Sequence, residues 1–233
     1  MEIKQLSQQQ ERDLLIMLSN RYLVDCSGAA RLVIMVETSD LLEVGIPVDP
    51  QSEYVVKVAI GMAGINQTAI ESGCYKSLGH KYPLAAIPFM GDYVEIMERV
   101  KVIDGPRCAW DQGDTEGFVS EMVQYYGSTE TEAKKMYDVV CALDELNGET
   151  SDNGQIGYTA DGRIVAFDYG YDARDDEGLC SDLDETLDFY NEDTLVAYLC
   201  ALKNLVGADI RELEELETNL LNNGIEALGE DLC

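Results

Sequence analysis

The chain has 233 residues, 46% of them hydrophobic, and its 45 acidic and 16 basic residues give a formal net charge of −29. This length and apolar content suffice for one large domain or for two lobes around a cleft. So large an excess of carboxylates argues against direct binding of DNA or RNA, and it leaves either a solvated acidic coat or a surface that attracts basic proteins.

The first half of the chain is expected to be rich in strands after a leading helix at residues 1–20. The run Tyr54–Ala59 predicts a short apolar strand with one lysine, Lys57, inside it. A lysine in such a strand lies either on a solvent-facing edge or at a position kept for an anion. The strand alone does not decide between these two interpretations.

A helix is expected at Asn66–Glu71, after a turn over Gly61–Gly64. It carries an acidic residue, Glu71, fourteen residues beyond Lys57. The next apolar run, Tyr93–Val100, predicts another strand.

The second half is expected to be mostly helical. Apolar residues at helical spacing and a favourable N-cap at Ser128 predict amphipathic helices, which most often form core. The amphipathic helices are expected at Phe118–Tyr126 and Thr131–Leu146, and apolar helices at Thr194–Val206 and Ile210–Leu221.

A hairpin is expected between the second and third of these helices. Ile156 and Tyr158 lead into the turn pair Asp161-Gly162, and the apolar run Ile164–Phe167 follows. The run ends at Asp168, which is followed by Tyr169-Gly170. Asp168 is either a simple capping residue or, by similarity to the D-F/Y-G motif of protein-kinase folds, a carboxylate that would hold a metal.

Seven scattered cysteines show no Cys-x-x-Cys spacing. They predict reduced thiols and a cytoplasmic protein.

In this order, the motifs resemble those of small protein-kinase-like proteins encoded by bacteriophages. The matching segments are Gly28-Ala29-Ala30-Arg31, Val55–Ala59 with Lys57, Gly64-Ile65-Asn66-Gln67 with Glu71, and Asp168-Tyr169-Gly170. The resemblance covers roughly residues 20 to 175, and it depends on the order of four weak motifs.

The resemblance implies an α+β, bilobal protein-kinase-like fold. Residues 1–20 would form the leading helix, 21–100 a small β-rich N-lobe, and 101–233 a reduced, mostly helical C-lobe with an acidic C-terminal part. Lys57 would contact the phosphates of ATP and Glu71 would hold that lysine in place.

The resemblance assigns the remaining site residues as well. Gly28 and Arg31 would help to bind the nucleotide, and Asp168 would hold Mg²⁺ together with Gln155.

The catalytic loop departs from the family pattern D-x-H-x-G-N-x-G. Thr150 stands at the position of the Asp, Asp152 at that of the His, and Gln155 at that of the Asn. Threonine cannot serve as a carboxylate base, so Asp152 is the candidate catalytic residue only if the loop is rearranged.

An acidic cluster directly follows the D-Y-G motif, and no A-P-E-like anchor ends the segment. This cluster fits a solvated loop or a docking surface for a basic partner; its spacing is unlike that of a twelve-residue calcium loop. The residues expected to contact the partner are Asp172, Asp175, Asp176, Asp182 and Asp184.

Two functions follow. The first is a pseudokinase-like protein that has lost phosphotransfer and binds a basic surface of a host or phage protein in the infected bacterial cytoplasm, as an inhibitor or nucleic-acid mimic. The second is an atypical phosphotransferase or nucleotidyltransferase dependent on ATP and Mg²⁺, with Asp152 relocated. The loss of the family Asp favours the first.

Overall fold

The structure is a computed structural model that describes residues 2–21, 26–27, 30–102, 114–147, 155–169 and 192–224. It has α+β architecture and divides into two compact units. The sheet unit comprises residues 2–69, 87–99 and 175–233, and the hairpin unit comprises residues 70–86 and 100–174.

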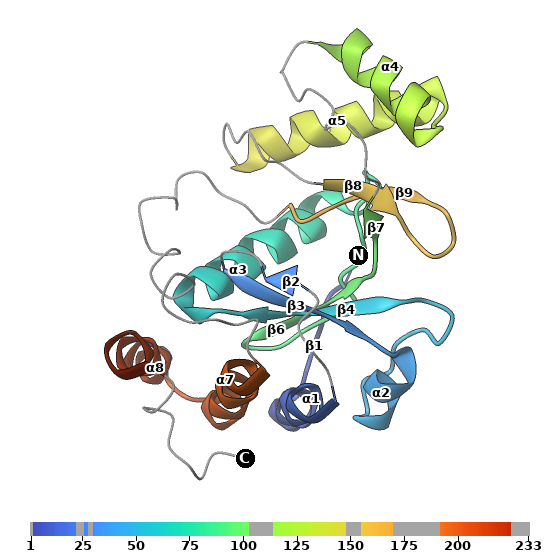
Figure 1. The fold of residues 1–233 in the computed structure, drawn as a ribbon. Coiled ribbons are helices and arrows are strands. Elements are labelled where there is room, and N and C mark those ends of the chain that lie inside the picture. Colours follow the sequence, from blue (N-terminus) through green and yellow to red (C-terminus); the bar gives the residue numbers. More distant parts are fainter. Residues whose placement is uncertain are drawn as a thin grey trace. The chain divides into compact units, whose positions relative to one another are not determined.

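A six-stranded sheet with the order β1-β5-β6-β4-β3-β2 organises the sheet unit (Figure 1). Its strands are β1 (Lys4–Gln5), β2 (Cys26–Ser27), β3 (Arg31–Val36), β4 (Tyr54–Ala59), β5 (Phe89–Met90) and β6 (Val94–Glu98). β1 pairs with β5 in parallel, and the other pairs are antiparallel. The strands expected at 54–59 and 93–100 are therefore confirmed as β4 and β6, and β4 is a central strand.

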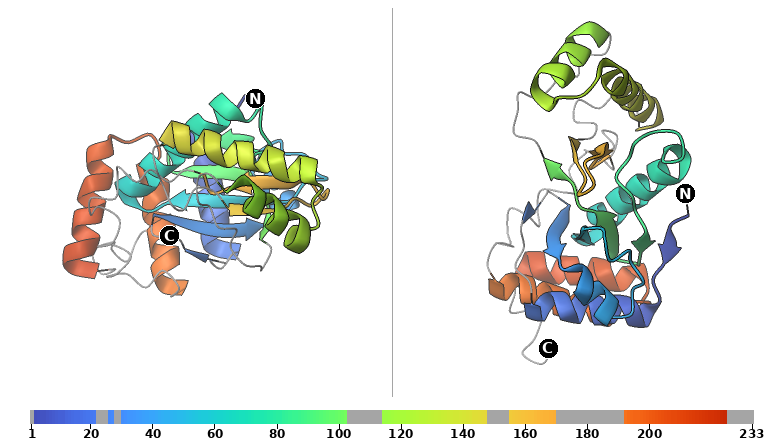
Figure 2. Two further views of the ribbon diagram at one scale, coloured as in Figure 1. Left: turned by 90° about the horizontal axis from the view of Figure 1, so that it is seen from above. Right: turned by 90° about the vertical axis from the view of Figure 1, so that its right-hand side faces the viewer.

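One face of this sheet carries the hydrophobic core. Side chains alternate between the two faces of a strand, so Tyr54, Val56 and Val58 of β4 point to the same face. They share their core with buried residues of α1 (Gln8–Arg21), α7 (Glu192–Leu205) and α8 (Ile210–Asn223). α1 and α7 lie side by side against the sheet (Figures 1 and 2), and α2 (Thr38–Glu43) connects β3 to β4.

The placement of α7 and α8 differs from the expected division at residue 100. Both helices were expected in the lobe formed by residues 101–233, yet they belong to the sheet unit. The physical reason is their apolar stripe: Leu199, Leu202 and Leu213 are buried in the core that β4 and α1 also form. The leading helix was expected at residues 1–20, but α1 begins at Gln8, and β1 precedes it.

α3 (Gly61–Leu78) is much longer than the helix expected at 66–71. The glycines that suggested a turn lie within its first turn instead. Gly64 permits a close approach, because a Cβ there would lie 2.7 Å from the Cα of Ala59. The helix can therefore start directly beside the end of β4.

Among its described residues, the hairpin unit contains a three-stranded antiparallel sheet, β7-β8-β9, two complete helices and residues 70–78 of α3. These elements are β7 (Lys101–Val102), β8 (Gln155–Tyr158), β9 (Ile164–Phe167), α4 (Thr115–Tyr126) and α5 (Glu130–Asn147). The expected hairpin is confirmed, with Gly162 of its turn at a φ of 82°. Asp114 caps α4 by accepting a hydrogen bond from the Gly117 N–H (2.8 Å).

The N-cap of α5 is Thr129 and not the expected Ser128. The Thr129 hydroxyl accepts from the Glu132 N–H (3.2 Å), and the Glu132 carboxylate accepts from the Thr129 N–H (2.8 Å). This is a capping box. The Ser128 hydroxyl is buried without a hydrogen-bond partner among the described residues.

Thr129→Ala is expected to lower the free energy of unfolding by about 1 kcal/mol, because it removes the acceptor for an orphan helix N–H. Ser128→Ala is the matched control and should change it by less than about 0.5 kcal/mol. Chemical denaturation of both variants measures the difference. An equal loss in both would contradict the assignment of the cap.

Cys74 and Cys141 are reduced thiols, as expected, but Cys200 is disulfide-bonded. This corrects the expectation that every cysteine is reduced. Among the described residues, no helix combines the length and the apolarity needed to span a membrane.

Candidate functional site

Lys57 lies in the middle of the sheet, away from any edge. Its strand, β4, pairs with β3 on one side and β6 on the other, and Lys57 stands opposite Val33 and Glu95. The side chain is only 4% exposed, and it points to the face opposite the core residues Val56 and Val58. The interpretation as an edge lysine is therefore wrong. An ammonium buried in this way has to be compensated by other charges or by an anion.

Two further buried charges lie on the same face. Arg31 lies two residues before Val33 on β3, and Val33 is paired with Lys57, so the Arg31 and Lys57 side chains point to the same face. Glu95 lies directly across from Lys57 on β6. The Arg31 Nη1 lies 3.9 Å from the Glu95 Oε1, and both side chains are at most 3% exposed. Two buried cations and a buried carboxylate thus share this face, an arrangement suited to anion binding. Arg31 was a predicted site residue, whereas Glu95 was not.

Glu71 lies in the half of α3 that belongs to the hairpin unit and is fully buried. Its Oε1 accepts a hydrogen bond from the Tyr169 N–H (3.2 Å), although the two residues lie 98 positions apart. Tyr169 is also buried, and its hydroxyl donates to the Ala85 carbonyl (3.0 Å). The structure thus brings together two of the predicted motifs, the helix glutamate and the D-Y-G segment.

Asp168 adopts a left-handed backbone conformation, with a φ of 54°. It is the one residue other than glycine with positive φ among those the structure describes. Asp tolerates this conformation better than most residues, yet it still carries a modest strain. Asp168 follows the last residue of β9, and the next residue, Tyr169, is held by its hydrogen bonds to Glu71 and Ala85. Strain of this kind, maintained by its surroundings, is typical of functional sites.

The remaining predicted site residues lie outside the described residues or have no described side chain. Gly28, Thr150 and Asp152 lie outside the described residues, as does the acidic segment 172–185. Gln155 begins β8, but the structure describes only its backbone. The roles predicted for these residues remain predictions. Across the described ranges there is no cluster of three His, Cys, Asp or Glu residues that could hold a metal.

Sequence reasoning missed two residues, Tyr169 in the hairpin unit and Glu95 in the sheet unit. Tyr169 was read only as the middle of a motif, and its two hydrogen bonds depend on residues far away in sequence. The sequence did contain a signal for Glu95, because this carboxylate stands inside an apolar run, Val94-Glu95-Ile96, as Lys57 stands inside the apolar run of its own strand. Only the strand register shows that the two residues face each other.

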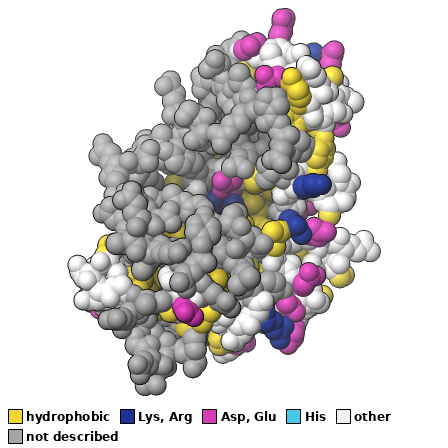
Figure 3. Space-filling view, viewed as in Figure 1, with side chains coloured by type: hydrophobic (Ala, Val, Ile, Leu, Met, Phe, Trp, Pro, Cys, Tyr) yellow, Lys and Arg dark blue, Asp and Glu magenta, His cyan; other side chains and the backbone are white. Residues whose placement is uncertain are grey.

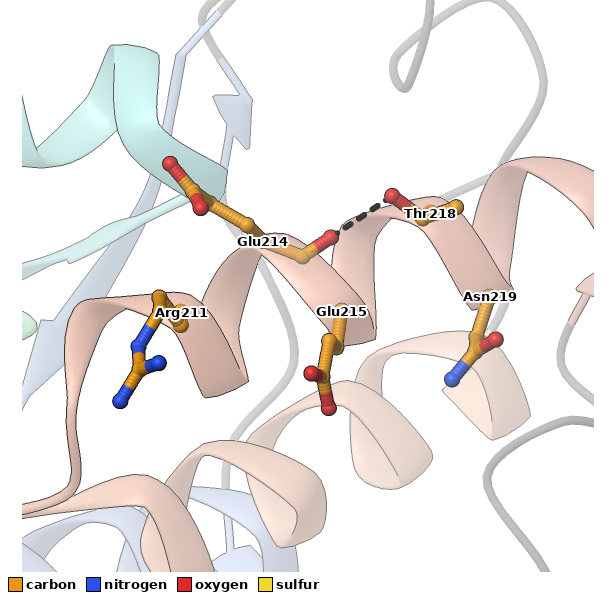
Figure 4. Close-up of a pocket in the computed structure, with 5 residues that line it drawn as sticks. All are labelled: Arg211, Glu214, Glu215, Thr218 and Asn219. Carbon is orange, nitrogen blue, oxygen red and sulfur yellow. Dashed lines mark hydrogen bonds between the residues drawn. The ribbon is translucent and has the colours of Figure 1, made fainter.

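The described surface also carries charged side chains. Acidic side chains on the face in Figure 3 are interspersed with lysine and arginine. A depression on α8 is lined by exposed side chains of that single helix, shown in Figure 4, namely Arg211, Glu214, Glu215, Thr218 and Asn219. Arg211 is paired with Asp209 at 2.8 Å, so its charge is already balanced. This depression is an ordinary helix surface.

Comparisons of the chain with known protein families, with curated proteins and with solved structures find no match. The functional argument therefore depends on the residues themselves.

Proposed function

We propose that this chain is a kinase-like nucleotide-binding protein that binds ATP with Mg²⁺ and does not transfer the γ-phosphoryl group efficiently. The resemblance to phage kinase-like proteins assigns Lys57 to the phosphates and Asp168 to the metal. The observation that carries the proposal is the hydrogen bond from the Tyr169 N–H to Glu71. The burial of Lys57 on a central strand, beside Arg31 and Glu95, supports the same interpretation.

The absence of efficient transfer follows from the catalytic loop. A threonine, Thr150, stands where the family has the Asp that orients or deprotonates the attacking hydroxyl. Loss of such a group typically lowers the rate by orders of magnitude. The alternative, an active phosphotransferase or nucleotidyltransferase, requires Asp152 to act in its place. The nucleotide-binding residues are common to both proposals, so turnover separates them.

Thermal unfolding tests the binding step directly. MgATP at about 100 times its dissociation constant should stabilise the folded protein by about 2.7 kcal/mol and raise Tm by several degrees. Magnesium alone and ATP with EDTA serve as controls, because a kinase-like site is expected to bind ATP and Mg²⁺ together. An unchanged Tm at millimolar MgATP would overturn the proposal.

We further propose that the acidic segment 172–185 docks a basic surface of a host or phage protein. The support is the net charge of −29 and the cluster that follows Asp168. Attraction between exposed charges is screened over about 10 Å at 0.1 M salt, so association with this partner should slow steeply as salt rises.

A quadruple variant tests the docking segment. Replacing four of its aspartates by asparagine should reduce the association rate at low salt at least tenfold and leave Tm within about 2 °C. The positions are Asp175, Asp176, Asp182 and Asp184. Stopped-flow or surface-binding kinetics with a partner captured from host lysate gives the measurement. A rate that responds neither to salt nor to the four substitutions would leave the segment as a solubility coat.

A further inference from the structure

The junction between β4 and α3 is held by two side chains from the C-terminal helices. Tyr198 of α7 donates its hydroxyl hydrogen to the Ala59 carbonyl (2.9 Å) and accepts from the Gly61 N–H (3.0 Å). Glu217 of α8 accepts from the Met62 N–H through its Oε1. These residues lie 137 to 155 positions from their partners, so the contact is entirely tertiary.

These hydrogen bonds satisfy groups that the helix itself cannot satisfy. The first N–H groups of an α-helix have no partner within it, and a carboxylate near them also interacts favourably with the helix dipole. The expected N-cap side chain is missing here because Ile60 precedes Gly61. Tyr198 and Glu217 therefore supply this N-terminal cap, although both residues lie far from α3 in sequence.

The local backbone is adapted to this cap. Gly61 has a φ of +58°, and a Cβ at that position would lie 2.7 Å from the Cδ of Glu217. The Tyr198 side chain is almost completely buried, and burial raises the pKa of its hydroxyl, which keeps it protonated as a donor. Burial also raises the pKa of the Glu217 carboxyl, while the Met62 N–H lowers it.

The position of the cap gives it a role beyond local stability. It fixes the residue that ends β4, the strand of Lys57, and the residues that begin α3, the helix of Glu71. Within the sheet unit, the cap therefore holds both the end of the strand that carries Lys57 and residues 61–69 of α3. Neither Tyr198 nor Glu217 needs to touch a nucleotide to influence residues that do.

We propose that Tyr198 and Glu217 are positioning residues for nucleotide binding, acting through the start of α3. This inference rests on the proposed function and names the part of the chain that controls it, the α7–α8 helix pair. Loss of the cap is expected to weaken MgATP binding at least fivefold. A fivefold change is about the lower end of what coupling between two distinct sites typically causes. A cap with a merely structural role would change Tm and leave the affinity of the folded protein unchanged.

Four full-length variants test the proposal. Tyr198→Phe removes the hydroxyl and keeps the ring, and Glu217→Ala removes the acceptor. Glu217→Gln keeps an oxygen that can accept from the Met62 N–H, so it should retain most of the affinity. Glu215→Ala is the matched control, because Glu215 is an exposed residue of the same helix (Figure 4).

Two measurements are made on each protein at a temperature where it is folded. Hydrogen exchange of the α3 amides over residues 61–69, without nucleotide, reports the cap itself. Titration with MgATP reports its effect on binding. We expect faster exchange and at least fivefold weaker MgATP binding in Tyr198→Phe and Glu217→Ala, with Glu217→Gln and Glu215→Ala close to the wild type.

The outcomes separate this inference from the proposed function. If the wild type binds MgATP and Tyr198→Phe and Glu217→Ala keep its affinity within twofold, the inference is overturned and the proposed function stands. Unchanged exchange at residues 61–69 in both variants would overturn it as well, because the cap would not hold the helix. A wild-type protein that does not bind MgATP overturns the proposed function and this inference together.

Discussion

Lys57→Met is expected to weaken MgATP binding roughly 30-fold. A charge-assisted hydrogen bond to a phosphate contributes about 2 kcal/mol, and a factor of ten in affinity corresponds to about 1.4 kcal/mol. Methionine resembles lysine in length, and Arg31 still lies 3.9 Å from the buried Glu95 carboxylate after the substitution, so the fold should persist. Asp168→Asn should have an effect of similar size, since asparagine tolerates the left-handed backbone at φ 54° but carries no charge for Mg²⁺. Calorimetric titration measures both.

Lys76→Met is the control for the loss of one positive charge. Lys76 is an exposed residue of α3, so the substitution changes the net charge as Lys57→Met does without touching the sheet. Its MgATP affinity should stay within twofold of the wild type. Equal weakening in Lys57→Met and Lys76→Met would show that net charge, and not the buried lysine, determines binding.

Glu11→Ala is expected to cause the largest loss of stability, about 3–5 kcal/mol of the free energy of unfolding. The buried Glu11 carboxylate of α1 accepts hydrogen bonds from three successive N–H groups, those of Asp92 (2.9 Å), Tyr93 (2.7 Å) and Val94 (3.2 Å). Alanine leaves these donors without their acceptor at a largely buried turn. Urea denaturation gives the measurement, and a loss below about 1 kcal/mol would contradict this role.

Glu11→Gln is the companion variant and tests the charge. Burial raises the pKa of the Glu11 carboxyl above its usual 4.5, although the three N–H groups oppose this. A raised pKa in the folded state means that the contribution of Glu11 is fully present below pH 4.5 and declines as pH rises through the folded pKa. The stability of the wild type relative to Glu11→Gln should therefore fall as pH increases from 4.5, and a constant difference would contradict the shift.

Local patterns in the sequence were sufficient for several elements. The Asp161-Gly162 turn between two apolar runs predicted the hairpin, which forms with its turn glycine at φ 82°. The apolar run around Lys57 predicted β4. In both cases the signal lies within a few residues of the element it specifies, so no tertiary information was needed.

The start of α3 could not be predicted in this way. Gly61 and Gly64 are weak helix formers and indicated a turn. The helix begins there because Tyr198 and Glu217 supply its missing cap and because Gly64 allows close packing on Ala59. These partners become neighbours only after folding, so tertiary contacts override the local propensity.

Part of the candidate site could not be predicted from the sequence for the same reason. The motifs named Lys57, Glu71, Arg31 and Asp168, but their spacing said nothing of Glu95 or of the Tyr169 hydrogen bonds. Those depend on strand register and on the position of a helix almost one hundred residues away in sequence. The strain at Asp168 is likewise a backbone property that residue identity alone does not show.

Equilibrium dialysis of the full-length protein against labelled MgATP tests the central claim most directly, because it measures bound nucleotide and its chemical fate in one sample. The account predicts about one nucleotide per chain, recovered as intact ATP, with no label transferred to the protein or to a generic acceptor. Absence of bound nucleotide would contradict the account. Transfer of label that is lost in Asp152→Asn would also contradict it and would establish an active phosphotransferase in its place.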